Sequence, residues 1–126
     1  MDPKSSAQKI ATQHRLIESL FGGLGSALAA RDAVHAQPRI AGLGRALDAH
    51  FVLEEGHYFP RLRDARPDCG PDLDRLVEEH LAMRSQVEDV SSCLDRGDWD
   101  AAAGTLAALR SLFERHEAFE REIVGS

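Results

Sequence analysis

The chain has 126 residues and a formal net charge of −6. That length predicts a single domain, residues 1–126, with a substantial core. Because the chain is acidic and has no run of Lys or Arg, we expect no nucleic-acid surface and no attachment to an anionic membrane. No apolar run is long enough to span a membrane, and the polar first residues lack a signal-peptide core.

The two cysteines, Cys69 and Cys93, fall in a predicted loop and near the far end of the helix that follows it. A helix of that length separates them by roughly 30 Å at about 1.5 Å per residue, which is too far for a disulfide. We therefore expect a reducing, cytoplasmic setting.

Four stretches of the chain have the apolar spacing of helices. Ala, Leu, Arg and Glu are abundant and Val and Ile are few, which favours helix over sheet. Apolar residues recur every three or four positions in each stretch. The first stretch runs from about residue 6 to 31, the second begins near Pro38, the third follows a turn signal over residues 64–72, and the fourth follows Gly97, with Asp98 as its N-cap.

The connections between these stretches are short. Residues 32–38 are expected to form a loop, and His35 within it is given no role. Pro60 predicts a kink in the second helix, or its end soon afterwards. Four helices joined by short links predict an all-α fold, an antiparallel up-down four-helix bundle.

Ligand-type residues replace apolar ones on all four helices. Two helices carry His-x-x-x-Glu, whose side chains lie one turn apart on one helix face. Counted from the turns at ~1.5 Å per residue, the whole set falls in one layer, within about one helical turn. Its members are His14, His50, Glu54, His80, His116 and Glu120.

A metal centre competes with a plain polar core as the explanation of this layer. A hydrogen-bonded network of Glu and His would lower the cost of burying two carboxylates, which is several kcal/mol each when they lack a cation. Imidazole with carboxylate suits iron, manganese or zinc. In the metal interpretation, His14 and His50 hold one ion, His80 and His116 hold the other, and Glu54 and Glu120 bridge them.

Other residues near the layer receive secondary assignments. His57 lies on the same seam, seven residues after His50, and is either an extra ligand or proton donor, or a structural histidine. Tyr58 is either a donor or ligand near the metals, or an aromatic residue at the rim. The remaining expectations are surface charges at Glu18, Glu55 and Glu117, walls at Met83 and Phe113, and an end plug at Trp99.

These residues, in this order, resemble the hemerythrin or HHE cation-binding domain over nearly the whole chain. The segment from His50 to Pro60 is close to that family's helix-two signature. The resemblance implies two iron ions in a non-haem di-iron centre, often with an oxo or hydroxo bridge. The oxygen-carrying members have a further histidine where this chain has Leu76, and an aspartate where it has Arg121. The pattern here is more similar to iron-sulfur-repair di-iron proteins and to the iron-sensing F-box protein's domain.

Three functions follow as hypotheses. Fewer nitrogen ligands leave open coordination positions, which favours binding or reduction of a small oxidant: O2, NO or H2O2. A second hypothesis is an iron or oxygen sensor that acts through metal-dependent folding. A third is a structural zinc-bound bundle. A redox role calls for an electron donor, and a sensor of this size calls for a partner or a homodimer; whether the chain is an enzyme is left open.

Overall fold

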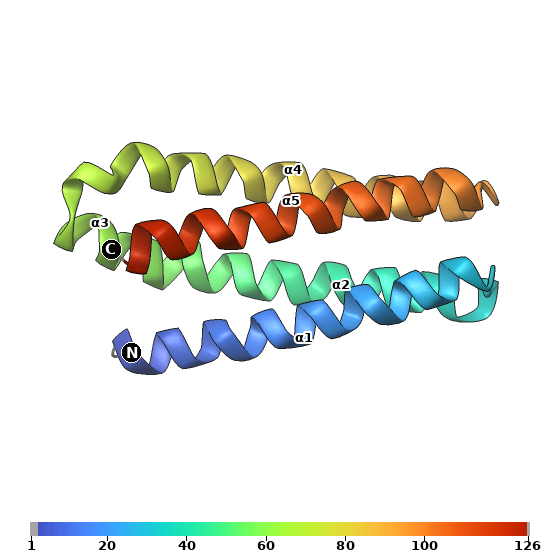
Figure 1. The fold of residues 1–126 in the computed structure, drawn as a ribbon, viewed down its shortest axis with the longest axis horizontal. Coiled ribbons are helices and arrows are strands. Elements are labelled where there is room, and N and C mark those ends of the chain that lie inside the picture. The colour runs from blue at the N-terminus through green and yellow to red at the C-terminus, as the bar shows by residue number, and fades with distance from the viewer. Residues whose placement is uncertain (1–2, 126) are drawn as a thin grey trace.

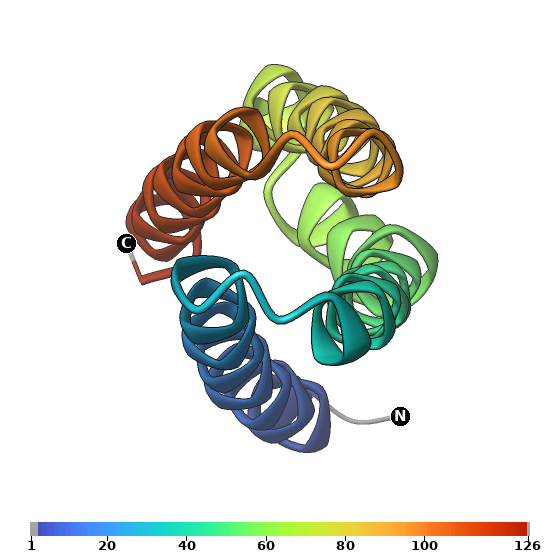
Figure 2. The same ribbon diagram turned by 90° about the vertical axis from the view of Figure 1, so that its right-hand side faces the viewer.

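The computed structural model describes the backbone of residues 3–125 and the side chains of residues 8–123. Four helical rods run antiparallel in up-down order around a common axis (Figures 1 and 2). They are α1 (Pro3–Ala29); α2 (Ala33–Leu53) continued by the π-helix η1 (Glu54–Tyr58) and α3 (Phe59–Ala65); α4 (Gly70–Asp95), which follows the 3₁₀ helix η2 (Pro67–Cys69); and α5 (Trp99–Gly125). The predicted four-helix bundle is confirmed.

Two turns at the same end of the bundle are built alike. After α1 ends at Ala29, Arg31 has a φ of +50°, and Asp32 N–H donates to the Ala27 carbonyl at 2.9 Å. After α4 ends at Asp95, Gly97 has a φ of +69°, and the next residue, Asp98, makes the equivalent bond to the Cys93 carbonyl at 2.9 Å. This left-handed cap satisfies the last carbonyls of each helix. Asp98 also accepts from Ala101 N–H at 3.1 Å, so its predicted N-cap role is confirmed.

The second rod begins earlier than predicted. Asp32 caps α2 by accepting from the His35 N–H at 3.2 Å, and its other oxygen lies 2.6 Å from His35 Nδ1. The predicted loop over residues 32–38 is therefore wrong, because the cap starts the helix at Ala33. Pro38 lies inside α2, where the bond it cannot make belongs to the carbonyl of Val34 in the first turn. Val34 is exposed, so water can satisfy that carbonyl.

A π turn precedes Pro60 in the second rod. Phe59 N–H bonds the Glu54 carbonyl, five residues back, and α3 then continues the rod to Ala65. A proline ring clashes with the carbonyl four residues before it, and the wider turn relieves that clash. The sequence predicted a kink or an end at Pro60; the structure instead has a π turn in a rod that continues.

The core consists of two apolar clusters. The larger cluster includes Phe21, Phe51 and Phe113, and the smaller one includes Phe59 and Ile123. Glu54, His80, His116 and Glu120 fall between residues of the two clusters along their rods, and His14 and His50 lie beside residues of the larger cluster. The polar layer therefore lies inside the bundle with apolar packing on both sides.

Both cysteines are free, as expected, and both are buried. None of the described helices combines the length and the apolar character needed to cross a membrane.

Candidate metal centre

The six predicted ligand residues meet inside the bundle. Each rod contributes at least one of them, because every seam position faces the common axis. They form two groups of three, and within each group the candidate ligand atoms lie within 4.8 Å of one another. The groups are His14, His50 and Glu120, and Glu54, His80 and His116.

The inward nitrogen atom of each histidine is Nε2. His14 Nε2 lies 3.0 Å from His50 Nε2, and His80 Nε2 lies 3.2 Å from His116 Nε2. The histidine pairing is the one that the sequence predicted for the two ions.

Glu54 links the two groups. Its Oε1 lies 3.2 Å from His50 Nε2, 3.1 Å from His80 Nε2 and 4.0 Å from His116 Nε2. Glu120 Oε2 lies 3.7 Å from His116 Nε2, although Glu120 is grouped with His14 and His50. Both carboxylates therefore reach members of both groups, as a bridging ligand must.

The outward nitrogen atom of each histidine, Nδ1, has an oxygen partner on a neighbouring rod. We call these four partners the outer acceptors: Gln13, Glu55, Glu79 and Glu117. The contacts are His50 to Gln13 at 2.9 Å, His80 to Glu55 at 2.6 Å, His116 to Glu79 at 2.8 Å and His14 to Glu117 at 3.1 Å. They form a closed circuit around the bundle, since each rod contributes one histidine and one acceptor.

Two outer acceptors correct the sequence analysis, which treated Glu55 and Glu117 as surface charges. Glu117 is buried and Glu55 is half-buried. Each of these two residues directly follows a candidate ligand in the sequence. Gln13 and Glu79 each directly precede one. A residue next to a seam position is turned about 100° around the helix, which is enough to reach the adjacent rod. Adjacency to a ligand was the signal that could have found all four.

The outer contacts of His50, His80 and His116 fix the protons of their rings. An amide oxygen or an ionised carboxylate only accepts, so Nδ1 is the donor. In the neutral form of each ring, Nε2 is then a bare lone pair that points toward the centre. Burial first, and the neighbouring rings next, lower the pKa of His14 to about 4, of His50 to about 3 and of His80 to about 2. These three rings are therefore neutral near pH 7.

One oxygen of each central carboxylate lacks a donor. Oε2 of Glu54 and Oε2 of Glu120 are buried without a hydrogen-bond partner. Burial raises the pKa of Glu54 well above its usual value, and the adjacent Glu120 raises it further. A proton on Glu54 would satisfy one lone pair at most. The layer thus presents a surplus of buried acceptors, which a positive ion between them would satisfy.

The contact between His14 and Glu117 is weaker than its distance suggests. Burial, followed by the charge of Glu18, raises the pKa of Glu117 to about 7, while the pKa of His14 is low. Oε1 of Glu117 also lacks a well-aligned hydrogen bond. We therefore regard this contact as a polar pair with little ionic character near neutral pH.

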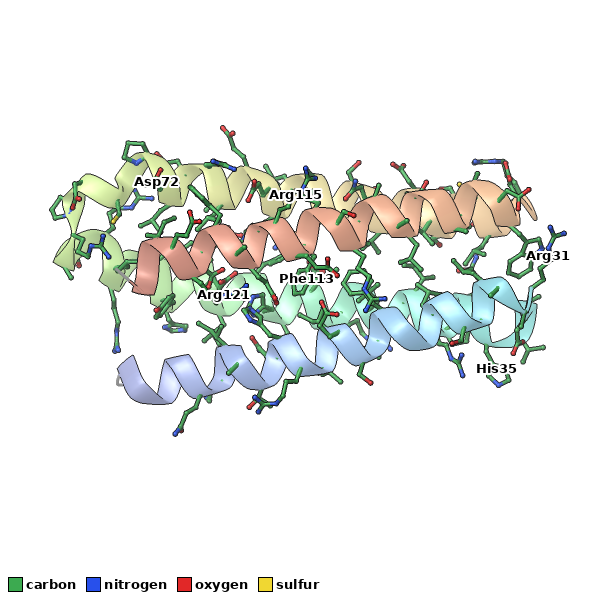
Figure 3. All side chains as sticks on the ribbon, viewed as in Figure 1. Arg31, His35, Asp72, Phe113, Arg115 and Arg121 are labelled. Atoms are coloured by element: carbon green, nitrogen blue, oxygen red, sulfur yellow. The ribbon has the colours of Figure 1, made fainter. Side chains whose placement is uncertain are left out.

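Aromatic rings enclose the centre. The ring of Phe51 stacks on His80 at 3.9 Å between centroids, and the ring of Phe113 meets the edge of His14 at 5.9 Å. Figure 3 shows Phe113 directed into the bundle, whereas Arg115 points outward. Met83 and Phe113 are fully buried, in agreement with their predicted role as walls. These side chains limit the access of water to the polar layer.

His57 is not among the grouped residues. Its side chain is exposed, and Tyr58 instead is half-buried. The π turn closes on the fifth residue rather than the fourth, so the seam position after Glu54 falls on Tyr58. Burial, followed by the charges of Glu120 and Glu54, raises the pKa of Tyr58. The structure thus gives His57 no contact with the centre and places Tyr58 close to it.

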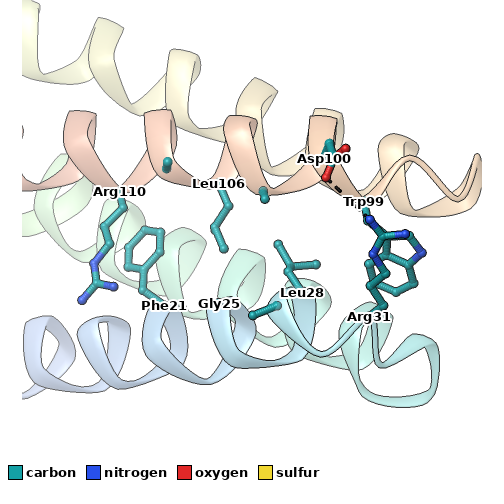
Figure 4. Close-up of a pocket in the computed structure, with 11 residues that line it drawn as sticks. Phe21, Gly25, Leu28, Arg31, Trp99, Asp100, Leu106 and Arg110 are labelled. Carbon is teal, nitrogen blue, oxygen red and sulfur yellow. Dashed lines mark ion pairs between the residues drawn. The ribbon is translucent and has the colours of Figure 1, made fainter.

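A separate pocket of about 450 Å³ lies between α1 and α5, toward the turn after α1 (Figure 4). Its lining includes Phe21, Leu28 and Leu106, with Trp99 at one end. Trp99 is half-buried against the larger apolar cluster, which agrees with its expected place at the end of the bundle. None of the lining residues is a candidate ligand, so this pocket is not part of the metal centre.

Comparison with known proteins identifies the family. The family model described as the hemerythrin HHE cation binding domain matches residues 5–126. Comparisons with curated proteins and with solved structures returned no match. The match covers all four rods and every candidate ligand. The chain therefore belongs to the hemerythrin HHE cation-binding domain family.

Proposed function

We propose that this protein binds two iron ions and reacts with a small oxidant, O2, NO or H2O2. The observation that carries the proposal is the set of inward ligand atoms: four histidine Nε2 atoms and two carboxylates, drawn from all four rods. Imidazole and carboxylate together suit iron, and carboxylates between two histidine pairs suit two ions. The residues that would hold them are His14, His50, Glu54, His80, His116 and Glu120.

The chain itself contributes orientation and shielding. A pair of iron ions, when bound, supplies one-electron redox change and open coordination positions for a diatomic molecule or a peroxide. Gln13, Glu55 and Glu79 hold the rings of His50, His80 and His116 with Nε2 inward and keep Nδ1 protonated. Phe51 and Phe113 keep water away, so charges within the layer act more strongly on each other.

The four candidate histidine ligands differ in exposure. His14 keeps 19% of its side-chain area exposed, while His50, His80 and His116 are fully buried. A small oxidant would therefore approach beside His14, between α1 and α5. The exposed Arg121 stands near this entrance, with its guanidinium 3.8 Å from Glu117. Free, buried cysteines are consistent with the cytoplasmic location that we propose.

Metal analysis with absorption spectroscopy tests this function. The protein is loaded with Fe²⁺ without oxygen, desalted, measured for iron, and then exposed to air. We expect two irons per chain and new near-ultraviolet absorption after exposure. His80→Gln should lower the iron content, while the exposed His35→Gln should not. Fewer than one iron per chain, or tightly held zinc without colour, would contradict the di-iron proposal.

A sensor is the second candidate function. It is favoured by the buried oxygens of Glu54 and Glu120 that have no hydrogen-bond partner. Removing a cation would leave their negative charge unbalanced in the polar layer, to which all four rods contribute. Iron removal should then lower the melting temperature and increase protease cleavage. Multiple turnovers of H2O2 or NO would favour the redox function, whereas a change of structure without turnover would favour the sensor. A sensor would also need a partner or a homodimer to carry the signal.

A further inference from the structure

The two proposed ion positions differ in their surroundings. We call Glu54, His80 and His116 the inner position, and His14, His50 and Glu120 the outer position. This inference rests on the proposed metal-binding function. We infer that the inner position binds its metal ion first and more tightly, and that Gln13 is the residue that keeps the outer position weak.

Burial separates the two positions. All three side chains of the inner position are fully buried, with no exposed area. In the outer position, His14 keeps 19% of its side-chain area exposed and Glu120 keeps 6%. Charge interactions strengthen as water is excluded, so an ion in the inner position gains more from its carboxylate.

The two positions also differ in the groups that accept the Nδ1 protons of their histidines. Both histidines of the inner position are bonded to carboxylates, His80 to Glu55 at 2.6 Å and His116 to Glu79 at 2.8 Å. In the outer position, His50 is bonded to the neutral amide oxygen of Gln13 at 2.9 Å. A carboxylate draws the Nδ1 proton more strongly than an amide does, and this makes Nε2 a better metal ligand.

Glu117, the acceptor beside His14, adds to the difference between the two positions. His14 Nδ1 lies 3.1 Å from Oε1 of Glu117, and this oxygen lacks a well-aligned hydrogen bond. The other oxygen of Glu117, Oε2, is 3.8 Å from the guanidinium of Arg121. Arginines also stand near the inner carboxylates, at 3.9 Å from Glu55 and 3.5 Å from Glu79. Pairing with arginine is therefore common to both positions. What distinguishes the outer position is the amide at Gln13 and the poor alignment of Glu117.

The positions therefore have different roles. The inner position holds an ion that stays bound, and the outer position, beside the exposed edge of His14, holds an ion that exchanges. Because loss of an outer hydrogen-bond partner typically costs 10–100-fold in metal affinity, we expect the two dissociation constants to differ by about 10-fold or more.

The test is a calorimetric titration of the metal-free protein with Fe²⁺ under anaerobic conditions. Wild-type protein should show two steps, one ion each. Glu79→Gln should weaken the tighter step by about 10-fold or more, while Glu78→Gln, an exposed neighbour with the same loss of charge, should leave both steps unchanged. His116→Gln should remove the tighter step and His14→Gln the weaker one.

The decisive variant is one that gains affinity. Gln13→Glu should tighten the weaker step and bring the two constants closer together, while Gln8→Glu, an exposed position on the same helix, should not. A misfolded variant cannot produce this gain. Two equal steps in the wild type, or a weaker step that Gln13→Glu leaves unchanged, would overturn the inference and leave the di-iron proposal intact. Absence of Fe²⁺ binding in the wild type would overturn both.

Discussion

Nε2 of His80 lies 3.2 Å from Nε2 of His116, while the Nδ1 atoms of both rings are committed to carboxylates on other rods. In two neutral rings held this way, the facing nitrogens are both acceptors, and their approach is unfavourable without a positive charge between them. A polar core that had to be stable by itself would alternate donors with acceptors. This arrangement instead favours the metal interpretation of the layer over a plain hydrogen-bonded network.

Glu54→Gln should separate metal binding from folding. The neutral amide cannot bridge two ions, so the iron content should fall by at least half. In the metal-free protein, however, the amide N–H groups can donate to the lone pairs of His50 and His80, which lie within 3.2 Å of the present oxygen. We expect the metal-free variant to gain about 1 kcal/mol, or roughly 4 °C in melting temperature.

The measurement pairs iron analysis with thermal unfolding in the absence of metal. Glu78→Gln is the control, because it removes the same charge from an exposed site. If metal-free Glu54→Gln melted at a lower temperature than the metal-free wild type, the Glu54 carboxylate would be making favourable hydrogen bonds in the metal-free protein. The polar-core interpretation would then be the better one.

His57→Leu should leave the centre unchanged. Its side chain is exposed and belongs to neither group of candidate ligands. We expect unchanged iron content and an unchanged absorption spectrum, whereas His50→Leu should lose both. A spectral shift in His57→Leu with folding intact would show that the side chain turns inward when metal is bound.

The helical period of the sequence predicted both the bundle and the six-residue layer, because each seam depends only on a regular spacing. It placed His57 on the seam because it assumed an α-helical turn after Glu54. The π turn shifts every later position by about one residue, so Tyr58 and Leu62 are half-buried while His57 and Arg61 are exposed. Pro60 marked the disturbance, but a proline does not by itself distinguish a kink from a wider turn.

The outer acceptors show a different limit of sequence analysis. Glu117 and Glu55 are charged and off the seam, and such residues usually face water. What makes them partners of histidines is how closely the adjacent rods approach, which depends on the packing of all four rods. The connection between α1 and α2 was also predicted too long. The N-cap at Asp32 starts α2 at Ala33, and the prediction had not recognised that cap.

The stability of the metal-free protein should depend on pH in two opposing ways. Burial lowers the pKa of His14, His50 and His80 to about 4, 3 and 2 from 6.5, so their contribution is present above pH 6.5 and is lost as pH falls. Burial raises the pKa of Glu54, and that of Glu117 to about 7, so their contribution is present below pH 4.5 and is lost as pH rises through 7.

Between pH 4.5 and 6.5 these trends partly cancel, and below pH 4.5 only the histidine trend remains. We expect a shallow change in the urea midpoint from pH 7 to 5, then a steep fall. Bound Fe²⁺ should raise the midpoint at pH 7, and this increment should vanish as protons displace the ion. Midpoints at pH 7, 5.5 and 4, with and without Fe²⁺, measure both effects. A metal-free midpoint that is flat down to pH 3 would mean that the buried rings take up protons without cost.

The left-handed residues Arg31 and Gly97, which follow α1 and α4, should affect stability in opposite ways when substituted. Both residues adopt the left-handed conformation at the end of a helix, with φ of +50° and +69°, and both precede an aspartate that caps the next helix. Glycine has no steric penalty there, whereas a residue with Cβ costs about 1 kcal/mol. The ion pair from Arg31 to Asp100 is long, at 3.8 Å, and exposed, so losing it should matter little.

Arg31→Gly should therefore stabilise the protein by about 0.5–1 kcal/mol, and Gly97→Ala should destabilise it by about 1 kcal/mol. Arg31→Ala is the control that removes the long side chain but keeps the Cβ, and it should leave stability nearly unchanged. The differences are read from urea unfolding at pH 7 in the absence of metal. If Arg31→Gly and Arg31→Ala were equally destabilising, contacts of the arginine side chain would outweigh the backbone strain at the end of α1.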